Sequence, residues 1–365
     1  MKQFEEKKER ELVLESQKLT RLPLYKIEVF RQLVDIHENQ PAFKTRTSTS
    51  IANQAYSTPI PIAYLLSCLT GVTQESTIYE PTAGHGALLI SSNPELVTAN
   101  EIDPKRALFL KELGYKVTTY NAVTYDPKQQ FDIILANPPF GSVVKDGVKQ
   151  TYRIGGSYTT EQIDHAIACH SASFMKPDGA AGFIVAGKLG NEASRSQSYG
   201  QKSSRNFFYY LYNTYNVVLH ISLAGKLYAK QGARYPIDLI VIKGRGKSQL
   251  DLPAVTIPKM YQSFSELEEL FQESSMKISI KDLFEKAASH KLNGIVYQDN
   301  EGQITLQIEP NTVYLETEDK KYTITYIMYK EWEDILFYLV GVDMEGNKEF
   351  FRISDEKWEL SYCSH

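Results

Sequence analysis

The chain has 365 residues, 42% of them hydrophobic and 23% charged, which is sufficient for one large α/β domain with a smaller appendage. No apolar run reaches the roughly 18 residues that a membrane-spanning helix needs, and the charged N-terminus MKQFEEKKERE lacks the apolar region of a secretory signal. The three cysteines form no CxxC pair, so we expect a cytoplasmic protein with no membrane association, disulfide framework or metal site.

The formal net charge of −4 conceals an uneven distribution. Residues 141–250 hold 14 Lys and Arg against 6 Asp and Glu, whereas residues 251–365 hold 11 against 22. The central segment can attract a polyanion and the C-terminal segment cannot, although a solvated charged surface would also explain either excess.

The N-terminal residues 3–38 have the pattern of helices, which Leu22 and Pro23 interrupt. One helix face is apolar, formed by Ile27, Phe30, Leu33, Val34 and Ile36. Residues 39–58 are polar and rich in Thr and Ser, which predicts a loop.

Short apolar runs alternate with helical patterns between residues 77 and 243. We predict seven strands, at Thr77–Glu80, Leu96–Ile102, Lys116–Thr119, Phe131–Ala136, Ala180–Ala186, Val217–Ser222 and Ile237–Lys243. We predict helices at 85–91, 104–113, 161–176 and 203–214. This alternation indicates an α/β fold, in which helices cover both faces of a mostly parallel sheet and ligands bind at the carboxyl ends of its strands.

The C-terminal segment has a different pattern. Residues 263–272 and 279–287 each begin with a Ser followed three residues later by an acid, which is typical of capped short helices. The runs ITLQI, VYLET, KYTITYIMY, ILFYLVGV and EFFRI predict a small β domain. We therefore divide the chain into an N-terminal helical segment 1–50, a main domain 51–250 and a small α+β C-terminal domain 251–365.

The first motif is IYEPTAGHGALL, residues 78–89, where a strand ends in an acid and a glycine-rich turn. Gly84 and Gly86 allow the backbone to approach a ligand, and the following helix offers N–H groups to it. Glu101 ends the next strand, where an acid can accept hydrogen bonds from ribose hydroxyls. Glycine-rich turns and acids at strand ends are also common without a ligand.

The second motif is ILANPPF, residues 134–140, in which an apolar strand ends in Asn137, Pro138, Pro139 and Phe140. Prolines cannot continue a central strand, and they stiffen the turn. The Asn137 side chain and the Pro138 carbonyl then form a pair of fixed acceptors that suits a planar NH2 group. Phe140 adds an aromatic face on which a base can stack. A proline-rich loop without a catalytic role is the alternative.

With these motifs in this order, residues 50–243 resemble the amino-methyltransferase family of DNA methylases, whose catalytic motif is Asn/Asp/Ser-Pro-Pro-aromatic. The order is similar to the gamma arrangement, with the cofactor motifs first. The resemblance implies a Rossmann-like fold, S-adenosylmethionine as cofactor and N6 of a flipped adenine in DNA as target. The matching cofactor residues are Tyr56, Thr58, Pro59, Glu80, Pro81, Ala83, Gly84, Gly86, Glu101 and Ile102.

The resemblance also implies roles for residues outside the two motifs. Asn121 stands where the family often has an Asp that contacts adenine. Tyr228, with Tyr235 as the second choice, matches an aromatic residue that holds the flipped base. Five basic residues, around the catalytic motif and in the Ser-rich stretch 190–208, are candidates for binding phosphates: Lys149, Arg153, Arg195, Lys202 and Arg205. An ordinary surface role is the alternative for each. A flexible solvated loop explains the stretch 190–208 at least as well.

Other interpretations remain open. Cytosine N4, a base in RNA or a protein glutamine amide could be the target, since related motifs occur in methyltransferases acting on each. A non-catalytic nucleic-acid-binding protein or subunit on the same scaffold is a different possibility. The acidic residues 251–365 fit a docking site for a specificity subunit at least as well as target recognition. The biological setting, restriction-modification among others, also stays open.

Overall fold

The structure is a computed structural model, and it forms two compact units, Met1–Arg21 with Val29–Phe271 and Leu22–Glu28 with Gln272–His365. It describes residues 2–21, 26–41, 57–232 and 235–271, and in the C-terminal part residues 296–299, 302–309, 312–316, 321–332, 335–344, 348–354 and 360–362. Within these ranges, no helix is long and apolar enough to cross a membrane.

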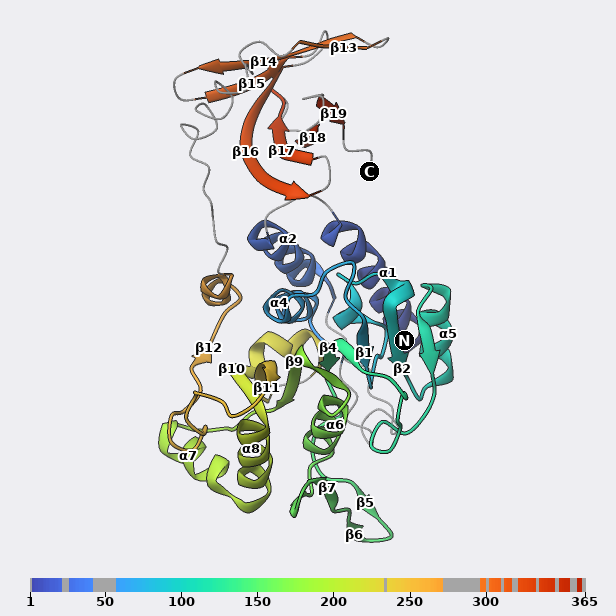
Figure 1. Cartoon of the computed structure of the whole chain (residues 1–365), viewed down its shortest axis with the longest axis vertical. Coiled ribbons are helices and arrows are strands. Elements are labelled where there is room, and N and C mark those ends of the chain that lie inside the picture. The colour runs from blue at the N-terminus through green and yellow to red at the C-terminus, as the bar shows by residue number, and fades with distance from the viewer. Residues whose placement is uncertain are drawn as a thin grey trace. The chain divides into compact units, whose positions relative to one another are not determined.

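The first unit is built on an eight-stranded sheet in the order β12-β10-β11-β9-β4-β1-β2-β3 (Figure 1). Its strands are β1 (Ile78–Glu80), β2 (Val97–Asn100), β3 (Lys116–Thr118), β4 (Phe131–Ala136), β9 (Met175–Ala186), β10 (Tyr215–Leu223), β11 (Ile237–Arg245) and β12 (Met260–Tyr261). Every neighbouring pair is parallel except the two that β11 makes with β9 and β10. All seven predicted strands are present, and β12 adds an eighth at the edge.

Helices flank this sheet (Figure 1). They are α1 (Lys2–Thr20), α2 (Lys26–Asn39), α4 (Ile60–Thr70), α5 (Pro104–Glu112), α6 (Ile163–Ala172), α7 (Glu192–Gly200) and α8 (Lys202–Thr214). Local chemistry sets several of their ends. The Asp103 side chain accepts hydrogen bonds from the N–H groups of Lys105 and Arg106 and so begins α5, while Gly71, in the left-handed region at φ +79°, ends α4.

Three parts of this unit differ from the sequence-based prediction. The predicted helix 85–91 is only a 3-10 turn at Ala87–Leu89. Residues 190–208 do not form a loop, because Asn191 caps α7 and α8 follows directly. The segment after β4 folds into two hairpins that we did not predict, β5 (Val144–Lys145) with β6 (Val148–Lys149) and β7 (Tyr152–Gly155) with β8 (Tyr158–Thr160).

The second unit contains a seven-stranded antiparallel sheet in chain order, which agrees with the predicted β domain. Its strands are β13 (Val296–Asp299), β14 (Gly302–Glu309), β15 (Thr312–Glu316), β16 (Lys321–Trp332), β17 (Ile335–Val342), β18 (Lys348–Ser354) and β19 (Leu360–Tyr362). The first predicted C-terminal helix is a 3-10 helix at Ser265–Leu270, in the first unit, and the second, 279–287, lies outside the described residues.

A continuous apolar core lies between the sheet and helices α6 and α8. It includes Tyr79, Phe131, Phe183 and Phe207, each at most 1% exposed. His165 of α6 is part of this core and stacks on Phe207 with 4.0 Å between ring centroids. Burial lowers the pKa of His165 to about 4, so the ring packs as a neutral aromatic group.

Candidate active site

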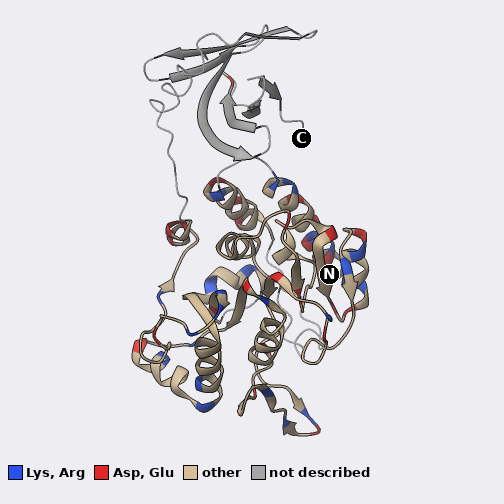
Figure 2. Cartoon of the chain, viewed as in Figure 1, with Lys and Arg blue, Asp and Glu red and all other residues tan. Residues whose placement is uncertain are grey.

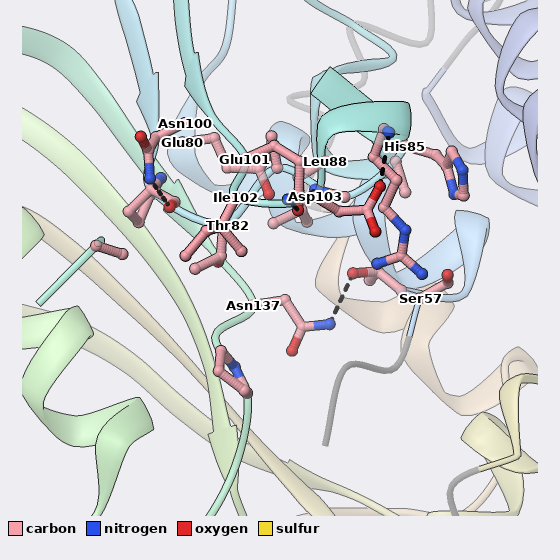
Figure 3. A pocket seen from close by; sticks show the side chains of 18 of the residues that line it. Ser57, Glu80, Thr82, His85, Leu88, Asn100, Glu101, Ile102, Asp103 and Asn137 are labelled. Carbon is pink, nitrogen blue, oxygen red and sulfur yellow. Dashed lines mark hydrogen bonds between the residues drawn. The ribbon is translucent and has the colours of Figure 1, made fainter. Parts of the chain in front are cut away.

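A cavity of about 370 Å³ opens where β1, β2 and β4 end (Figure 3). These strands are parallel neighbours, so their carboxyl ends meet at one edge of the sheet, and Glu80, Glu101 and Asn137 lie there. Many of the residues predicted from sequence line this cavity together: Thr58, Glu80, Pro81, Ala83, Gly84, Glu101, Ile102, Asn121, Asn137, Pro139 and Phe140. The two motifs therefore share one pocket.

Glu101 connects the glycine-rich turn to the following loop. Its two carboxylate oxygens accept hydrogen bonds from the backbone N–H groups of Gly84 and Asp103, both at 2.7 Å. Gly84 and Gly86 have φ of +56° and +83°, and a Cβ on Gly86 would lie 3.1 Å from a Leu110 methyl carbon. Since each carboxylate oxygen can accept more than one hydrogen bond, Glu101 retains acceptor capacity toward the pocket.

Glu80 is the most deeply buried acid of the pocket lining, with 2% of its surface exposed. Its Oε2 atom has no hydrogen-bond partner among the described residues. Burial, and secondarily the nearby charge of Glu101, raises the pKa of Glu80 well above its ordinary value. The Oε2 atom of Glu80 is therefore available to accept a hydrogen bond from a ligand in the pocket.

Asn100 holds three loops at this edge in place. Its amide NH2 donates to the carbonyl oxygens of Pro81 and Tyr120, at 3.0 and 2.8 Å. Its amide oxygen accepts from the Thr118 hydroxyl and the Tyr120 N–H. The loops after β1, β2 and β3 are thus joined by one buried side chain, which our sequence analysis did not single out.

Asn137 is oriented by a residue from another part of the chain. Its Nδ2 atom donates a hydrogen bond to the hydroxyl of Thr58, at 2.8 Å (Figure 3). This bond turns the amide oxygen of Asn137 away from Thr58. Thr58, which precedes α4, was predicted as a cofactor contact, and in the structure it also positions the residue predicted to be catalytic.

The segment after Phe140 is fixed by the beginning of α6. The Gly141 carbonyl accepts from the Ile163 N–H at 2.8 Å, and Asp164, with no exposed surface, accepts from the N–H groups of Gly141 and Ala186, at 3.4 and 3.0 Å. One carboxylate thereby ties the segment after Phe140 to β9. Phe140 is consequently held at the pocket wall.

Helix α1 supplies a wall that sequence reasoning missed. Glu9, Leu12 and Val13 line the pocket, and Glu9 Oε2 lies 2.6 Å from Nδ1 of His85 in the glycine-rich turn. Burial opposes ionisation of Glu9, but the hydrogen bond and charge of His85 and the charge of Arg106 hold the pKa of Glu9 below its ordinary value. Glu9 is therefore ionised at neutral pH.

Some predicted site residues lie elsewhere. Tyr56 is outside the described residues, and Pro59, Gly86 and Pro138 do not line the cavity. Tyr228 has no exposed surface, which does not support its predicted role in holding a base, whereas Tyr235 is 69% exposed. These placements leave Tyr235 as the accessible aromatic residue of the pair.

Arg195 also departs from its predicted role. It is 5% exposed, and its guanidinium donates to the Ser222 hydroxyl and the Pro258 carbonyl, at 2.7 and 2.8 Å. These bonds hold α7 against β10, so we no longer assign Arg195 to phosphate binding. Four other basic candidates are exposed and lie on the hairpins and the first turns of α8 (Figure 2): Lys149, Arg153, Lys202 and Arg205.

No protein-family model and no curated protein matches the chain. Solved structures similar to it include a proposed RNA methyltransferase from Pyrococcus horikoshii, at 18% identity over 59% of this chain and 98% of that one, with a TM-score of 0.39. The modification subunit of a proposed type I restriction enzyme from Vibrio vulnificus YJ016 is 13% identical over 76% and 57% of the two chains, with a TM-score of 0.43. A proposed class I S-adenosylmethionine-dependent methyltransferase from Listeria monocytogenes is 14% identical over 68% and 80%, with a TM-score of 0.41.

At these identities and TM-scores, the similar structures do not establish the activity of this protein. The fold class rests on the chain's own sheet, which is mostly parallel, flanked by helices and interrupted by the single antiparallel strand β11. The predicted α/β fold, a mostly parallel sheet covered by helices, is confirmed.

Proposed function

We propose that the protein is an S-adenosylmethionine-dependent methyltransferase that methylates the exocyclic amino group of adenine, at N6, in DNA. One observation carries this proposal. Asn137, Pro139 and Phe140 line the same cavity as the glycine-rich turn and Glu101, so an amino-group cradle and a nucleoside-binding edge adjoin each other.

The pocket residues fit this cofactor. The lining contains the acids Glu9, Glu80, Glu101 and Asp103, against the basic residues Arg106 and His85. An acidic lining suits a ligand with a positively charged sulfonium, and Glu80 has an unsatisfied buried oxygen. We assign the ribose hydroxyls to Glu101 and the adenine face to Ile102, which is 67% exposed beside it.

The cofactor, when bound, supplies an electrophilic methyl group. The chain's own contribution is positioning and a fixed polar environment. The Asn137 oxygen accepts a hydrogen bond from an N6 hydrogen, which draws the nitrogen lone pair out of conjugation with the ring. The Thr58 hydroxyl keeps the oxygen end of the Asn137 amide toward the substrate, and Phe140 stacks on the base.

The target base must leave the helix to reach this cavity. We assign the exposed residues Lys149, Arg153, Lys202 and Arg205 to the phosphates around it, with Tyr235 as an aromatic contact to the base. The C-terminal segment 251–365 has twice as many acidic as basic residues, which supports docking of a partner subunit in place of DNA binding.

The direct test is transfer of tritium from labelled S-adenosylmethionine to unmethylated DNA, followed by digestion to nucleosides. We expect label in N6-methyladenine, and we expect Asn137→Ala to bind the cofactor in calorimetry while losing transfer. Full turnover by Asn137→Ala would refute the mechanism.

The same assay separates the alternatives. Label in N4-methylcytosine would keep the cradle and change the base, and label only in RNA or in a protein would change the substrate class. Absence of cofactor binding would favour a nucleic-acid-binding protein on this scaffold over an enzyme.

A further inference from the structure

The hairpin β5–β6 is the least covered element of the first unit, and it begins four residues after Phe140. Every residue from Val143 to Lys149 is exposed, and the three valines Val143, Val144 and Val148 are 36%, 59% and 64% exposed. The second hairpin differs, because β7–β8 packs on α8 and buries Ile154 and Thr160. Packing on the rest of the first unit does not explain these exposed valines, and a two-stranded hairpin alone is only marginally stable in water. Their exposure therefore requires another explanation.

The register of the hairpin places a valine on each of its two faces. Val144 is paired with Lys149 and Lys145 with Val148, and neighbouring residues of a strand point to opposite sides. One face therefore carries Val144 and Lys149, and the other carries Val143, Lys145 and Val148. Both faces expose an apolar side chain beside a lysine, so the hairpin presents apolar groups to either side.

The hairpin is rigidly joined to the pocket. Its turn, Asp146-Gly147, has φ of +52° and +78°, as the tight type I′ turn requires, and Gln150 N–H donates to the Val143 carbonyl at its base. The residues at that base, Ser142 and Val143, line the pocket, and Gln162 bonds to Ser142 at 3.1 Å. Figure 1 shows the hairpin extending away from the sheet beyond α6.

The charges of the hairpin favour nucleic acid as its partner. Lys145 and Lys149 outnumber the one acid, Asp146, and Arg153 is exposed on the next hairpin. Figure 2 shows Lys and Arg positions in blue along the hairpins that follow β4. A two-stranded ribbon also fits the major groove of B-DNA.

From these observations we propose that the hairpin β5–β6 enters the groove of duplex DNA at the target base pair. The hairpin itself occupies the space that the extruded nucleotide leaves, with Val144 and Val148 facing the bases on its two sides, and Lys145 and Lys149 contact the phosphates. Apolar side chains inserted between base steps are a general means of stabilising distorted DNA. This proposal rests on the proposed function for its substrate, but not on methyl transfer.

The test compares binding of the full chain to a duplex with one central abasic site and to the same duplex intact, by fluorescence anisotropy. A wedge binds the abasic duplex more tightly because less unstacking is needed, and we expect a preference of about tenfold in the wild type. Val144→Thr with Val148→Thr keeps the side-chain shape and the β-branched character that strands favour, and it should abolish this preference. The matched control is Val218→Thr with Val255→Thr, two valines that are 40% and 74% exposed on other elements, and it should retain it.

Lys145→Gln with Lys149→Gln should weaken binding to both duplexes equally and reduce the salt dependence of binding. An equal affinity of the wild type for the two duplexes, or an unchanged preference after the valine substitutions, overturns the hairpin proposal even if methyl transfer to DNA is observed. Conversely, a preference that the valine substitutions abolish, in a protein that methylates no DNA, supports the hairpin proposal and refutes the proposed function.

Discussion

Replacing Glu9 by Gln tests whether α1 is a structural wall of the pocket. The Glu9 and His85 side chains are only 16% and 3% exposed, so their 2.6 Å hydrogen bond is poorly screened by water. Hydrogen bonds to charged groups contribute about 1.5–3 kcal/mol to stability. For a unit of this size about 1 kcal/mol corresponds to roughly 2–4 °C, so we expect the melting temperature at neutral pH to fall by about 3–12 °C.

The effect should depend on pH in a defined direction. The folded protein holds the pKa of Glu9 below its ordinary value of 4.5, so the ionised group stabilises the fold above that pH. This stabilisation is lost as the pH falls through the folded-state pKa. The melting temperatures of wild type and Glu9→Gln should therefore converge below pH 4.5.

A control on the same helix makes this prediction specific. Glu11 forms an ion pair with Lys8 at 2.5 Å, but its side chain is 44% exposed. Glu11→Gln should leave the melting temperature at neutral pH unchanged, because solvent-exposed ion pairs contribute little. Equal melting temperatures for the Glu9 and Glu11 variants would refute a wall held by the Glu9–His85 pair.

Three further predictions concern the pocket. Thr58→Val removes the acceptor that orients Asn137, so the single-turnover rate should fall roughly two- to twelvefold. Thr58→Ser keeps a hydroxyl and should retain the wild-type rate. An unchanged rate in Thr58→Val would show that Thr58 does not orient Asn137. Gly86→Ala combines a strained φ with a 3.1 Å contact to Leu110, so it should lower the urea midpoint more than Gly71→Ala, which has a similar φ and open space; about 1–3 kcal/mol is expected for the strain alone. Tyr235→Ala should raise the KM for DNA by roughly five- to 160-fold if the base stacks there, at about 1–3 kcal/mol per stacked base. Tyr228→Phe should leave the KM unchanged, since Tyr228 has no exposed surface and its hydroxyl has no hydrogen-bond partner among the described residues.

The sheet and most of the pocket edge could be predicted from sequence because their signals are local. An apolar run that ends in Asn-Pro-Pro must stop, and a parallel sheet brings the ends of such strands to one edge. The sequence was therefore enough to predict that Glu80, Glu101 and Asn137 lie close together, because each ends one of a set of neighbouring strands.

The rest depends on contacts between distant parts of the chain, which local patterns do not encode. The pairing of Glu9 with His85 spans 76 residues, and nothing in either neighbourhood indicates it. Helix α7 was missed because its sequence is rich in Ser, at positions 194, 196 and 198, and Ser has little helical preference. The helix is held by the Asn191 cap and by two side-chain hydrogen bonds. Arg195 donates to Ser222 of β10, and Ser196 donates to the Ala254 carbonyl. Tyr228 was misjudged for the same reason, since only tertiary packing buries it.

Because burial raises the pKa of Glu80, we expect the binding of a cationic ligand in the pocket to be linked to the protonation of this residue. Burial raises the pKa of this carboxyl group, and a positive charge bound beside it would lower that pKa again, so cation binding and loss of the proton favour each other. Binding of a cationic ligand should therefore be accompanied by proton release, so that the measured heat varies with the ionisation enthalpy of the buffer. Affinity should also increase as the pH rises, until Glu80 is ionised before the ligand binds.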